Sequence, residues 1–249
     1  MKSNLKIVLS LSLISFFIIL LNSCKKDEQV EPSSINLTNG KTTAVFNTSS
    51  TYGTLIDQDG NIYKTIKIGA QTWMAENLRT TKYNDGSKIP EVPDKETWSN
   101  LKTAGYCNYN NNSIIDSIAT YGRLYNWYSI NTGKLAPKGG HIPTDTEWDQ
   151  LIDFIGGSPD AAVKLKEKGN THWNSPNTGT NETGFTALPG GSRNFNGVFG
   201  TKFNDGFWWS SSEVNALLSW YRGMGYKYDN VGRSTYEKNV GFSVRCVKD

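Results

Sequence analysis

Residues 144–157 read Thr-Asp-Thr-Glu-Trp-Asp-Gln-Leu-Ile-Asp-Phe-Ile-Gly-Gly, which is the clearest helix signal in the chain. Thr144 and Glu147 have the spacing of a capping box, in which each side chain accepts a hydrogen bond from the backbone N–H of the other residue. Apolar residues follow at helical spacing, namely Trp148, Leu151, Ile152 and Ile155, and the two glycines predict the end of the helix. A second helix is predicted over residues 159–168, because proline stands in its first turn and glycine follows its end.

Short strand-like segments separated by glycines surround these two helices. A turn cluster at residues 57–61 precedes β-rich stretches at 62–68 and 71–78, a pattern that predicts a hairpin. Four later segments also have strand character, at residues 184–188, 207–211, 219–224 and 240–247. Two helices among many short strands predict an α+β domain with long irregular loops.

Two short stretches resemble calcium-binding elements, but neither is complete. Residues 57–61 have the spacing Asp-x-Asp-Gly-Asn, yet the later ligands of an EF-hand loop are missing. Phe203-Asn204-Asp205 resembles the W-N-D element of C-type lectins, yet no E-P-N or Q-P-D partner accompanies it. No metal site is therefore expected.

The first 23 residues have the pattern of a removable secretion signal. Two lysines precede residues 7–21, of which twelve are apolar and three are serine. This run is shorter than the roughly 20 apolar residues that span a membrane, and it matches the core of a signal peptide. Leu21-Asn22-Ser23-Cys24 resembles the lipobox of bacterial lipoproteins, so Cys24 is expected to become the lipid-bearing first residue. An uncleaved anchor helix with an incidental cysteine is the alternative.

The residues after Cys24 predict where the protein is held. Lys25-Lys26-Asp27-Glu28 resembles the charged segment of surface-exported lipoproteins of the Bacteroidetes. We therefore expect a lipid-anchored protein of the outer membrane that faces the cell surface, with a periplasm-facing protein as the alternative. A multiply acylated cysteine would anchor firmly, because each buried methylene contributes about 0.8 kcal/mol.

Composition and charge limit the classes of partner. The chain has 26 basic and 23 acidic residues, and loss of residues 1–23 removes two lysines, so the net charge becomes 24 minus 23, or +1. The sequence contains no basic cluster of the kind that binds nucleic acid, so no nucleic-acid partner is expected. Residues 24–52 are polar and predict a lipidated flexible linker, which leaves residues 53–249 as one globular domain. No cofactor is expected.

Two cysteines remain once Cys24 is used for lipid. In an oxidising compartment a single disulfide between Cys107 and Cys246 is the economical expectation, and it would close a loop of about 140 residues. Two unpaired buried thiols are the alternative. A metal site is not expected at these cysteines, because neither has a second ligand at C-x-x-C spacing.

Six phrases of the sequence, taken in order, resemble one known domain family. They lie at residues 68–79, 121–127, 135–148, 184–191, 207–211 and 241–247. Together they are similar to the Fibrobacter succinogenes major paralogous domain, a family of surface or secreted domains. Gly140 is a local departure, since a tryptophan is expected there in the family pattern. The chain is also distantly similar to formylglycine-generating, sulfatase-modifying proteins. This second resemblance implies a C-type-lectin-like domain.

The chemistry of sulfatase-modifying proteins does not carry over to this chain. Those enzymes use two closely spaced cysteines that bind copper, whereas Cys107 and Cys246 are far apart in the sequence. His141 is expected to have a packing or turn role, and His172 is expected to be solvated. A glycosidase would need two paired carboxylates, and nothing in the sequence pairs any two of Glu76, Glu147, Glu182 and Glu213. We therefore expect no catalysis, with a degenerate enzyme scaffold as an alternative.

Aromatic residues interleaved with amides and acids predict a site for a glycan or a cell-wall polymer. Aromatic rings stack on the C–H faces of sugars, while amide, carboxylate and guanidinium groups bond hydroxyls. The candidate residues are Trp173, Asn204, Asp205, Trp208, Trp209, Trp220 and Arg222. On a strand, one of the neighbours Trp208 and Trp209 must face inward. Exposure of Trp173, Trp208 and Trp220 to solvent would favour a sugar platform. A protein-binding adhesion or display domain is the alternative.

Overall fold

The computed structural model describes residues 36–249, which form one unit by their internal contacts. The signal peptide predicted over residues 1–23 and the lipidation predicted at Cys24 lie outside the described residues. None of the helices in the described part is long and apolar enough to cross a membrane. Short helices are interspersed among short, mostly antiparallel strands, so the α+β prediction is confirmed.

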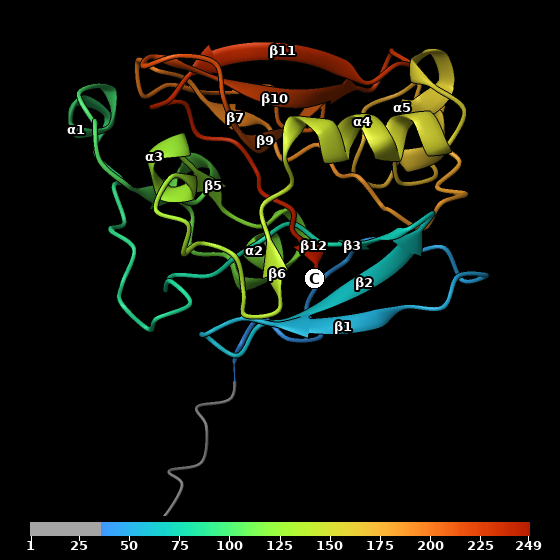
Figure 1. Cartoon of the computed structure of the whole chain (residues 1–249), viewed down its shortest axis with the longest axis horizontal. Coiled ribbons are helices and arrows are strands. Elements are labelled where there is room, and N and C mark those ends of the chain that lie inside the picture. The colour runs from blue at the N-terminus through green and yellow to red at the C-terminus, as the bar shows by residue number, and fades with distance from the viewer. Residues whose placement is uncertain (1–35) are drawn as a thin grey trace, which may run out of the picture. The chain divides into compact units, whose positions relative to one another are not determined.

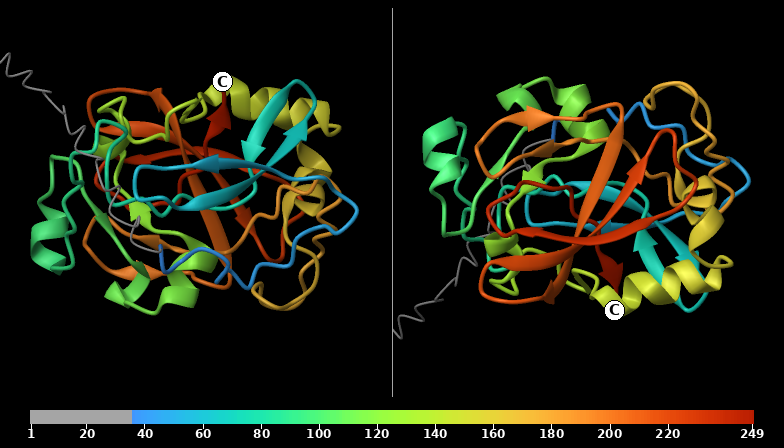
Figure 2. Two further views of the ribbon diagram at one scale, coloured as in Figure 1. Left: turned by 90° about the horizontal axis from the view of Figure 1, so that it is seen from below. Right: turned by 90° about the horizontal axis from the view of Figure 1, so that it is seen from above.

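Two antiparallel sheets lie on opposite sides of the described unit (Figures 1 and 2). The first contains, in spatial order, β1 (Gly53–Ile56), β2 (Ile62–Ile68), β3 (Gln71–Met74), β12 (Val247–Lys248) and β6 (Gly140–His141). The second contains β11 (Gly232–Glu237), β10 (Leu218–Gly225) and β9 (Asp205–Glu213). Two small ladders pair β4 (Tyr106–Cys107) with β5 (Leu124–Tyr125), and β7 (Ser192–Arg193) with β8 (Phe199–Gly200). The predicted hairpin is confirmed as β2 and β3.

The helices are short, and α4 (Asp145–Phe154) begins with the predicted capping box. Thr144 Oγ1 accepts from the Glu147 N–H at 3.2 Å, and the Thr144 N–H donates to Glu147 Oε2 at 2.8 Å. The second predicted helix is shorter than expected, because Lys166 turns to extended backbone and forms a bridge with Ala187. It consists of η2 (Ser158–Asp160) and α5 (Ala161–Leu165). Four further helical segments are not predicted from the sequence, namely α1 (Lys95–Ser99), η1 (Tyr109–Asn111), α2 (Ile115–Tyr121) and α3 (Trp127–Ile130).

Helix α4 packs between the two sheets. Its buried side chains share one apolar cluster with residues of β2 and β3 and with Trp208 of β9. In this cluster the ring centroids of Trp73 and Trp148 lie 4.7 Å apart. A second cluster, which includes Trp209 and Phe242, packs on the other side of β9. Strand β9 is therefore buried on both faces in its middle.

The two described cysteines are free and buried, so the expected disulfide is not formed and the alternative of two buried thiols holds. The two thiols do not meet because the cysteines belong to different clusters of the core. Cys107 packs with Trp98 and Leu124, while Cys246 lies in the cluster that contains Trp209. Burial raises the pKa of Cys107 to about 12 and raises the pKa of Cys246 further, so both remain protonated thiols at neutral pH.

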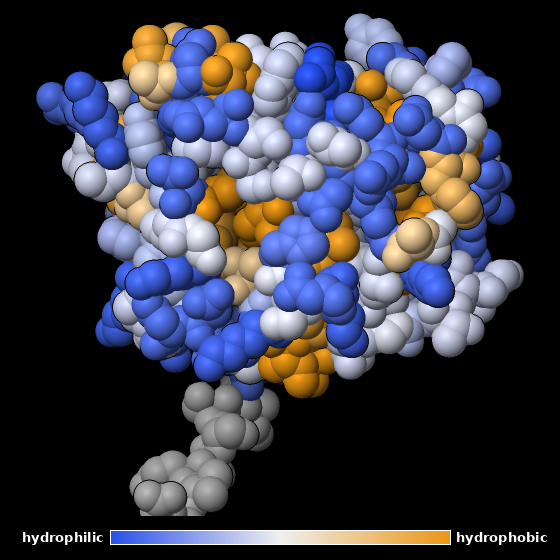
Figure 3. Space-filling model, in the orientation of Figure 1, coloured by the Kyte–Doolittle hydropathy of each residue, from blue (hydrophilic) through white to orange (hydrophobic). Residues whose placement is uncertain are grey.

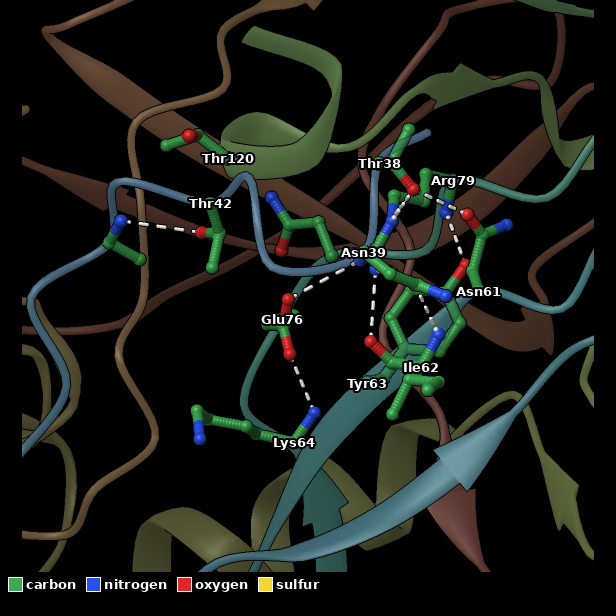
Figure 4. A network of polar contacts seen from close by, with 12 residues as sticks. Thr38, Asn39, Thr42, Asn61, Ile62, Tyr63, Lys64, Glu76, Arg79 and Thr120 are labelled. Atoms are coloured by element: carbon green, nitrogen blue, oxygen red, sulfur yellow. Dashed lines mark hydrogen bonds and ion pairs between the residues drawn. The ribbon is translucent and has the colours of Figure 1, made fainter. Parts of the chain in front are cut away.

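Residues 36–52, which we call the N-terminal strap, belong to the same unit as the rest of the domain. The prediction of a flexible linker is therefore wrong for this segment. Thr38 Oγ1 donates to Asn61 Oδ1 at 2.7 Å and accepts from Arg79 Nε at 2.9 Å (Figure 4). The buried Arg79 also donates to the Ile62 carbonyl at 2.9 Å and pairs with Glu76 Oε1 at 3.3 Å. Polar side chains thus dock a segment whose composition predicts mobility.

Candidate functional site

Three of the predicted binding tryptophans are buried. Trp173, Trp208 and Trp209 each have at most 1% of their surface exposed. Their indole N–H groups are also used internally, since Trp208 donates to Asn77 Oδ1 at 2.9 Å and the other two donate to backbone carbonyls. Strand alternation points Trp208 and Trp209 to opposite faces, but both faces of β9 are covered there. The prediction that these rings form a sugar platform is therefore wrong.

Trp220 and Arg222 help to hold the second sheet to α4. The buried Arg222 guanidinium lies 2.5 Å from Asp145 Oδ1 and 2.6 Å from Asp149 Oδ1, both on α4. The Arg233 guanidinium lies 3.6 Å from the centroid of the half-buried Trp220 ring and 2.7 Å from Asp145 Oδ2. These contacts give both predicted residues a structural role on the α4 side of the sheet.

Asp205 lies on the opposite face of the same sheet, where it lines a cavity of about 360 Å³. Residues two apart on a strand share a face, so Phe207 of β9 joins Asp205 there, and Tyr221 of β10 lies beside them. We call this cavity the sheet pocket. Other residues that line it are Gly223, Gly225, Tyr228, Asn230, Gly232 and Ser234. The predicted neighbour Asn204 is half-buried, and its Oδ1 accepts from Asn174 Nδ2 at 2.7 Å.

Glycines on the strands make room for the sheet pocket. Gly223, Gly225 and Gly232 occupy strand positions that line it. A Cβ on Gly223 would lie 3.2 Å from the Phe207 ring, and a Cβ on Gly225 would lie 2.8 Å from the Tyr228 ring. The absence of these side chains leaves a floor of backbone between aromatic walls.

Aromatic rings form the walls of the sheet pocket. The rings of Phe207 and Tyr221 meet edge to face, with centroids 5.8 Å apart. Tyr228 is 63% exposed and stands at the rim. Asn230 and Ser234 also line the cavity and supply polar atoms. Apolar walls with a few polar groups are the usual composition of a small-ligand site.

Asp205 brings a negative charge to the sheet pocket. Burial raises the pKa of Asp205, and a hydrogen bond with the Thr201 side chain partly offsets this rise. No ion pair found within residues 36–249 involves this carboxylate. Burial also raises the pKa of Tyr221, and the charge of Asp205 adds to that rise. The pocket therefore offers an acidic group beside a neutral phenol.

The buried side chain of Lys166 fixes the loop that carries Tyr228. Its ammonium donates to the carbonyls of Tyr228 at 2.9 Å and Gly225 at 3.2 Å, and to Thr178 Oγ1 at 3.2 Å. Burial lowers the pKa of Lys166, and the charge of Asp229 opposes this effect. These bonds tie the loop to the end of α5 and so fix the position of Tyr228 at the rim of the pocket.

Of the residues that line the sheet pocket, Asp205 is among the predicted binding residues, whereas Phe207, Tyr221 and Tyr228 are not. A signal for the pocket was present at residues 221–225, which read Tyr-Arg-Gly-Met-Gly. On a strand, this pattern leaves two successive positions of one face without side chains. A strand face of this kind either meets another backbone closely or leaves a hollow beside the flanking aromatic residue.

Both histidines make contacts that hold the fold together. His141 bonds Glu147 Oε1 at 2.7 Å and Asp249 Oδ1 at 2.6 Å, in keeping with the expected packing role. Partial burial alone would lower the pKa of His141, but its hydrogen bonds to these two carboxylates raise it. His172 is 7% exposed, so the expectation of a solvated side chain is wrong.

His172 connects the N-terminal strap to the domain. Its Nδ1 lies 2.8 Å from Glu167 Oε2, and its Nε2 lies 2.9 Å from Thr43 Oγ1. In the neutral imidazole, Nδ1 donates to the carboxylate and Nε2 accepts the hydroxyl proton. Glu167 Oε1 also accepts from the Val45 N–H at 2.6 Å, and Thr120 Oγ1 accepts from the Thr43 N–H at 2.9 Å. The strap is therefore held by a continuous chain of hydrogen bonds.

We expect Thr43→Val to loosen the strap without unfolding the domain. The change removes the hydroxyl that bonds His172, and one hydrogen bond contributes about 1 kcal/mol. Amide exchange at Val45, measured by mass spectrometry or NMR, should then accelerate by roughly fivefold or more. Thr48→Val is the control, because Thr48 is exposed and its side chain makes no hydrogen bond in the described part of the chain. Unchanged protection at Val45 would contradict this role for Thr43.

Comparison with known proteins gives one match. The family model described as the Fibrobacter succinogenes major domain matches residues 66–248. No curated protein and no solved structure matches the chain. The matched range contains β9, β10 and β11, and with them the whole sheet pocket, whereas the N-terminal strap lies before it.

Proposed function

The chain belongs to the Fibrobacter succinogenes major domain family, and we propose that this member is a non-catalytic cell-envelope protein that binds a glycan or a cell-wall polymer. The observation that carries the proposal is the sheet pocket, where aromatic side chains and an acid surround a glycine floor. A cavity of about 360 Å³ is within the usual range for small-ligand sites, and it can take one or two sugar units of a longer polymer.

The chemistry of the pocket suits a sugar. Exposed Tyr228 offers a ring face for the C–H surface of a pyranose, while Asp205, Asn230 and Ser234 can bond its hydroxyls. Fixation of the Tyr228 loop by Lys166 reduces the entropy that binding would cost. These features support a binding module that recognises its ligand with a preformed site.

The absence of catalysis is part of the proposal and is supported by the acids and bases of the described domain. The four glutamates considered for glycosidase chemistry each pair with a different basic side chain, namely Arg79, His141, Lys164 and Lys238. His172 is engaged with the N-terminal strap. Each of these groups therefore has a structural contact that accounts for its position.

We also propose that the protein is tethered through a lipid on Cys24 in the outer membrane and faces the cell surface. The described chain begins beside the turn between β1 and β2, where Asn36 Nδ2 donates to the Asp59 carbonyl at 2.8 Å. The C-type-lectin-like fold belongs to the same proposal and is supported by short antiparallel sheets joined by long loops.

Two substitutions test the site. The full chain in mild detergent is first screened on a glycan array, and the best polysaccharide is titrated by calorimetry. Tyr228→Ala should weaken binding about fivefold or more, because ring stacking on an apolar face contributes about 1 kcal/mol or more. Gly223→Ala should weaken binding similarly, because its Cβ would stand on the pocket floor 3.2 Å from the Phe207 ring.

Gly200→Ala is the matched control, because a Cβ there would meet no atom within 4 Å and Gly200 does not line the pocket. All three variants should keep the melting temperature within a few degrees of the native protein. If Tyr228→Ala and Gly223→Ala leave the affinity unchanged, the sugar binds elsewhere. If no polysaccharide binds, the proposal fails within the coverage of the array.

Protein binding is the second candidate function, and one surface feature favours it. Figure 3 shows apolar surface over the turn that joins β9 to β10. In this turn Val214 is 40% exposed and Leu217 is 71% exposed. Exposed apolar side chains of this kind suit contact with another protein. Binding that survives Gly223→Ala but is lost in Leu217→Ser would favour this candidate over the first.

A further inference from the structure

The carboxylate of Asp205 faces Tyr228 across Gly225. A Cβ on Gly225 would lie 3.0 Å from Asp205 Oδ1 and 2.8 Å from Tyr228 Cδ2, so both groups border the same small space. The Asp205 side chain belongs to none of the ion pairs of the described domain and is half-buried. An acid and an aromatic ring therefore stand close together over Gly225, and both line the sheet pocket.

The positive charges near the pocket are already engaged by other groups. Arg233 lines the cavity, but its guanidinium pairs with Asp145 at 2.7 Å and lies over the Trp220 ring on the α4 side. The Lys166 ammonium donates to loop carbonyls, and the charge that acts on it is that of Asp229. Neither side chain supplies a counter-charge to Asp205.

A ligand that covers Asp205 removes water from this carboxylate. A neutral sugar can return hydroxyl hydrogen bonds but no charge, so the cost of desolvation is only partly offset. A protonated amine returns a charge-assisted hydrogen bond, which is roughly twice as strong as a neutral one. The pocket therefore gains more from a cationic ligand than from a neutral ligand of the same shape.

The aromatic walls favour the same kind of ligand. Phe207, Tyr221 and Tyr228 bring three ring systems to one cavity, and the faces of such rings attract cations. The ring of an amino sugar also presents C–H groups that can stack on Tyr228. One molecule with an ammonium group on a pyranose ring could thus use the acid and the aromatic residues together.

We propose that the sheet pocket selects a polymer that contains amino sugars with free, protonated amines, with Asp205 pairing the ammonium and Tyr228 covering the sugar ring. This inference rests on the proposed function and narrows its ligand class. The N-acetylated form of the same sugar lacks the charge and carries an extra acetyl group. Acetylation of the amine is therefore the chemical difference to which the pocket responds.

The test compares two probes of equal length, a chitosan oligosaccharide with free amines and its fully N-acetylated counterpart. Each is titrated into the full chain by calorimetry, at a pH below the pKa of the sugar amine. The native protein should bind the free-amine probe about tenfold more tightly. Asp205→Asn, which keeps the shape of the side chain, should remove this preference and leave the affinity for the N-acetylated probe unchanged.

Asp153→Asn is the matched control, because Asp153 is an exposed acid on α4 outside the pocket, and its loss changes the net charge equally. If both aspartate variants lose the preference, general charge attraction explains it and the inference is overturned. If the native protein binds the N-acetylated probe as tightly as the amine, the inference is overturned while glycan binding stands. If neither sugar binds but a lysine-rich peptide does, the inference and the proposed function both fail.

Discussion

Replacement of Arg245 by methionine is expected to lower the free energy of unfolding by about 5 kcal/mol. Arg245 is fully buried, and its guanidinium donates to the carbonyls of Met74 at 3.0 Å and Thr186 at 2.7 Å, to the Phe185 carbonyl, and to Asn77 Oδ1 at 2.9 Å. Methionine would fill much of the volume but would donate to none of these acceptors, and Asn77 Oδ1 would keep only the indole N–H of Trp208. Each buried unsatisfied acceptor costs about 1–3 kcal/mol, so several together remove much of the stability of an ordinary domain.

The positive charge of the buried Arg245 does not cancel the stability that its hydrogen bonds provide. Burial lowers the pKa of Arg245 to about 9, which leaves the guanidinium protonated at neutral pH. Within residues 36–249 no carboxylate pairs with it directly, so its hydrogen bonds to carbonyl and amide oxygens offset the cost of burial. The guanidinium also lies 4.3 Å from the centroid of the Phe185 ring, a contact that adds a favourable cation–π term.

Chemical denaturation monitored by tryptophan fluorescence measures the effect of Arg245→Met. Arg233→Met is the control, because Arg233 is 45% exposed at its side chain and should cost less than about 1 kcal/mol. If Arg245→Met does not accumulate as a folded protein, Arg245→Lys keeps the charge and can reach some of the acceptors, so it should show an intermediate loss. Equal stability of the Arg245 and Arg233 variants would contradict the structural role of the buried guanidinium.

The elements that the sequence predicts well are those whose signals are local. The capping box at Thr144 and Glu147, followed by apolar residues at helical spacing, gives α4 with its start at the predicted residue. The turn at residues 57–61 similarly precedes β2 at its predicted bounds. In contrast, the stretch from 240 to 247 contributes only Val247 to a strand, because most of it crosses the core and touches several elements by isolated bridges.

The site was hard to predict mainly because Trp208 and Trp209, which are neighbours on one strand, are both buried. Alternation along a strand predicts one buried and one exposed face, and that rule holds only where one face meets solvent. Strand β9 is covered by the α4 cluster on one side and by Phe242 and its neighbours on the other, so Trp208 and Trp209 are both inside. Part of this covering comes from residues more than 30 positions away, such as Trp148 and Phe242, which local patterns do not reveal.

The N-terminal strap shows what amino-acid composition cannot predict. Its polar residues have the character of a linker, yet several of them bond partners far along the sequence, such as Thr38 with Arg79 and Thr43 with His172. These contacts form because buried polar groups of the domain need hydrogen-bond partners, and the polar side chains of the strap supply them. Composition alone cannot tell a polar segment that finds such partners from one that stays in water.

Trp208→Ala is expected to lower the free energy of unfolding by about 3–5 kcal/mol, whereas Trp220→Ala should cost about 1 kcal/mol. Trp208 is fully buried and donates to Asn77 Oδ1, so its removal leaves a large cavity and an acceptor with one donor fewer. Trp220 is half-buried and loses mainly its contact with Arg233. Urea denaturation of both variants checks the contrast, and equal losses would contradict the burial of Trp208. Loss of ligand binding in Trp208→Ala would report damage to the core rather than contact with a sugar, so Tyr228 and Gly223 are the positions that probe the site.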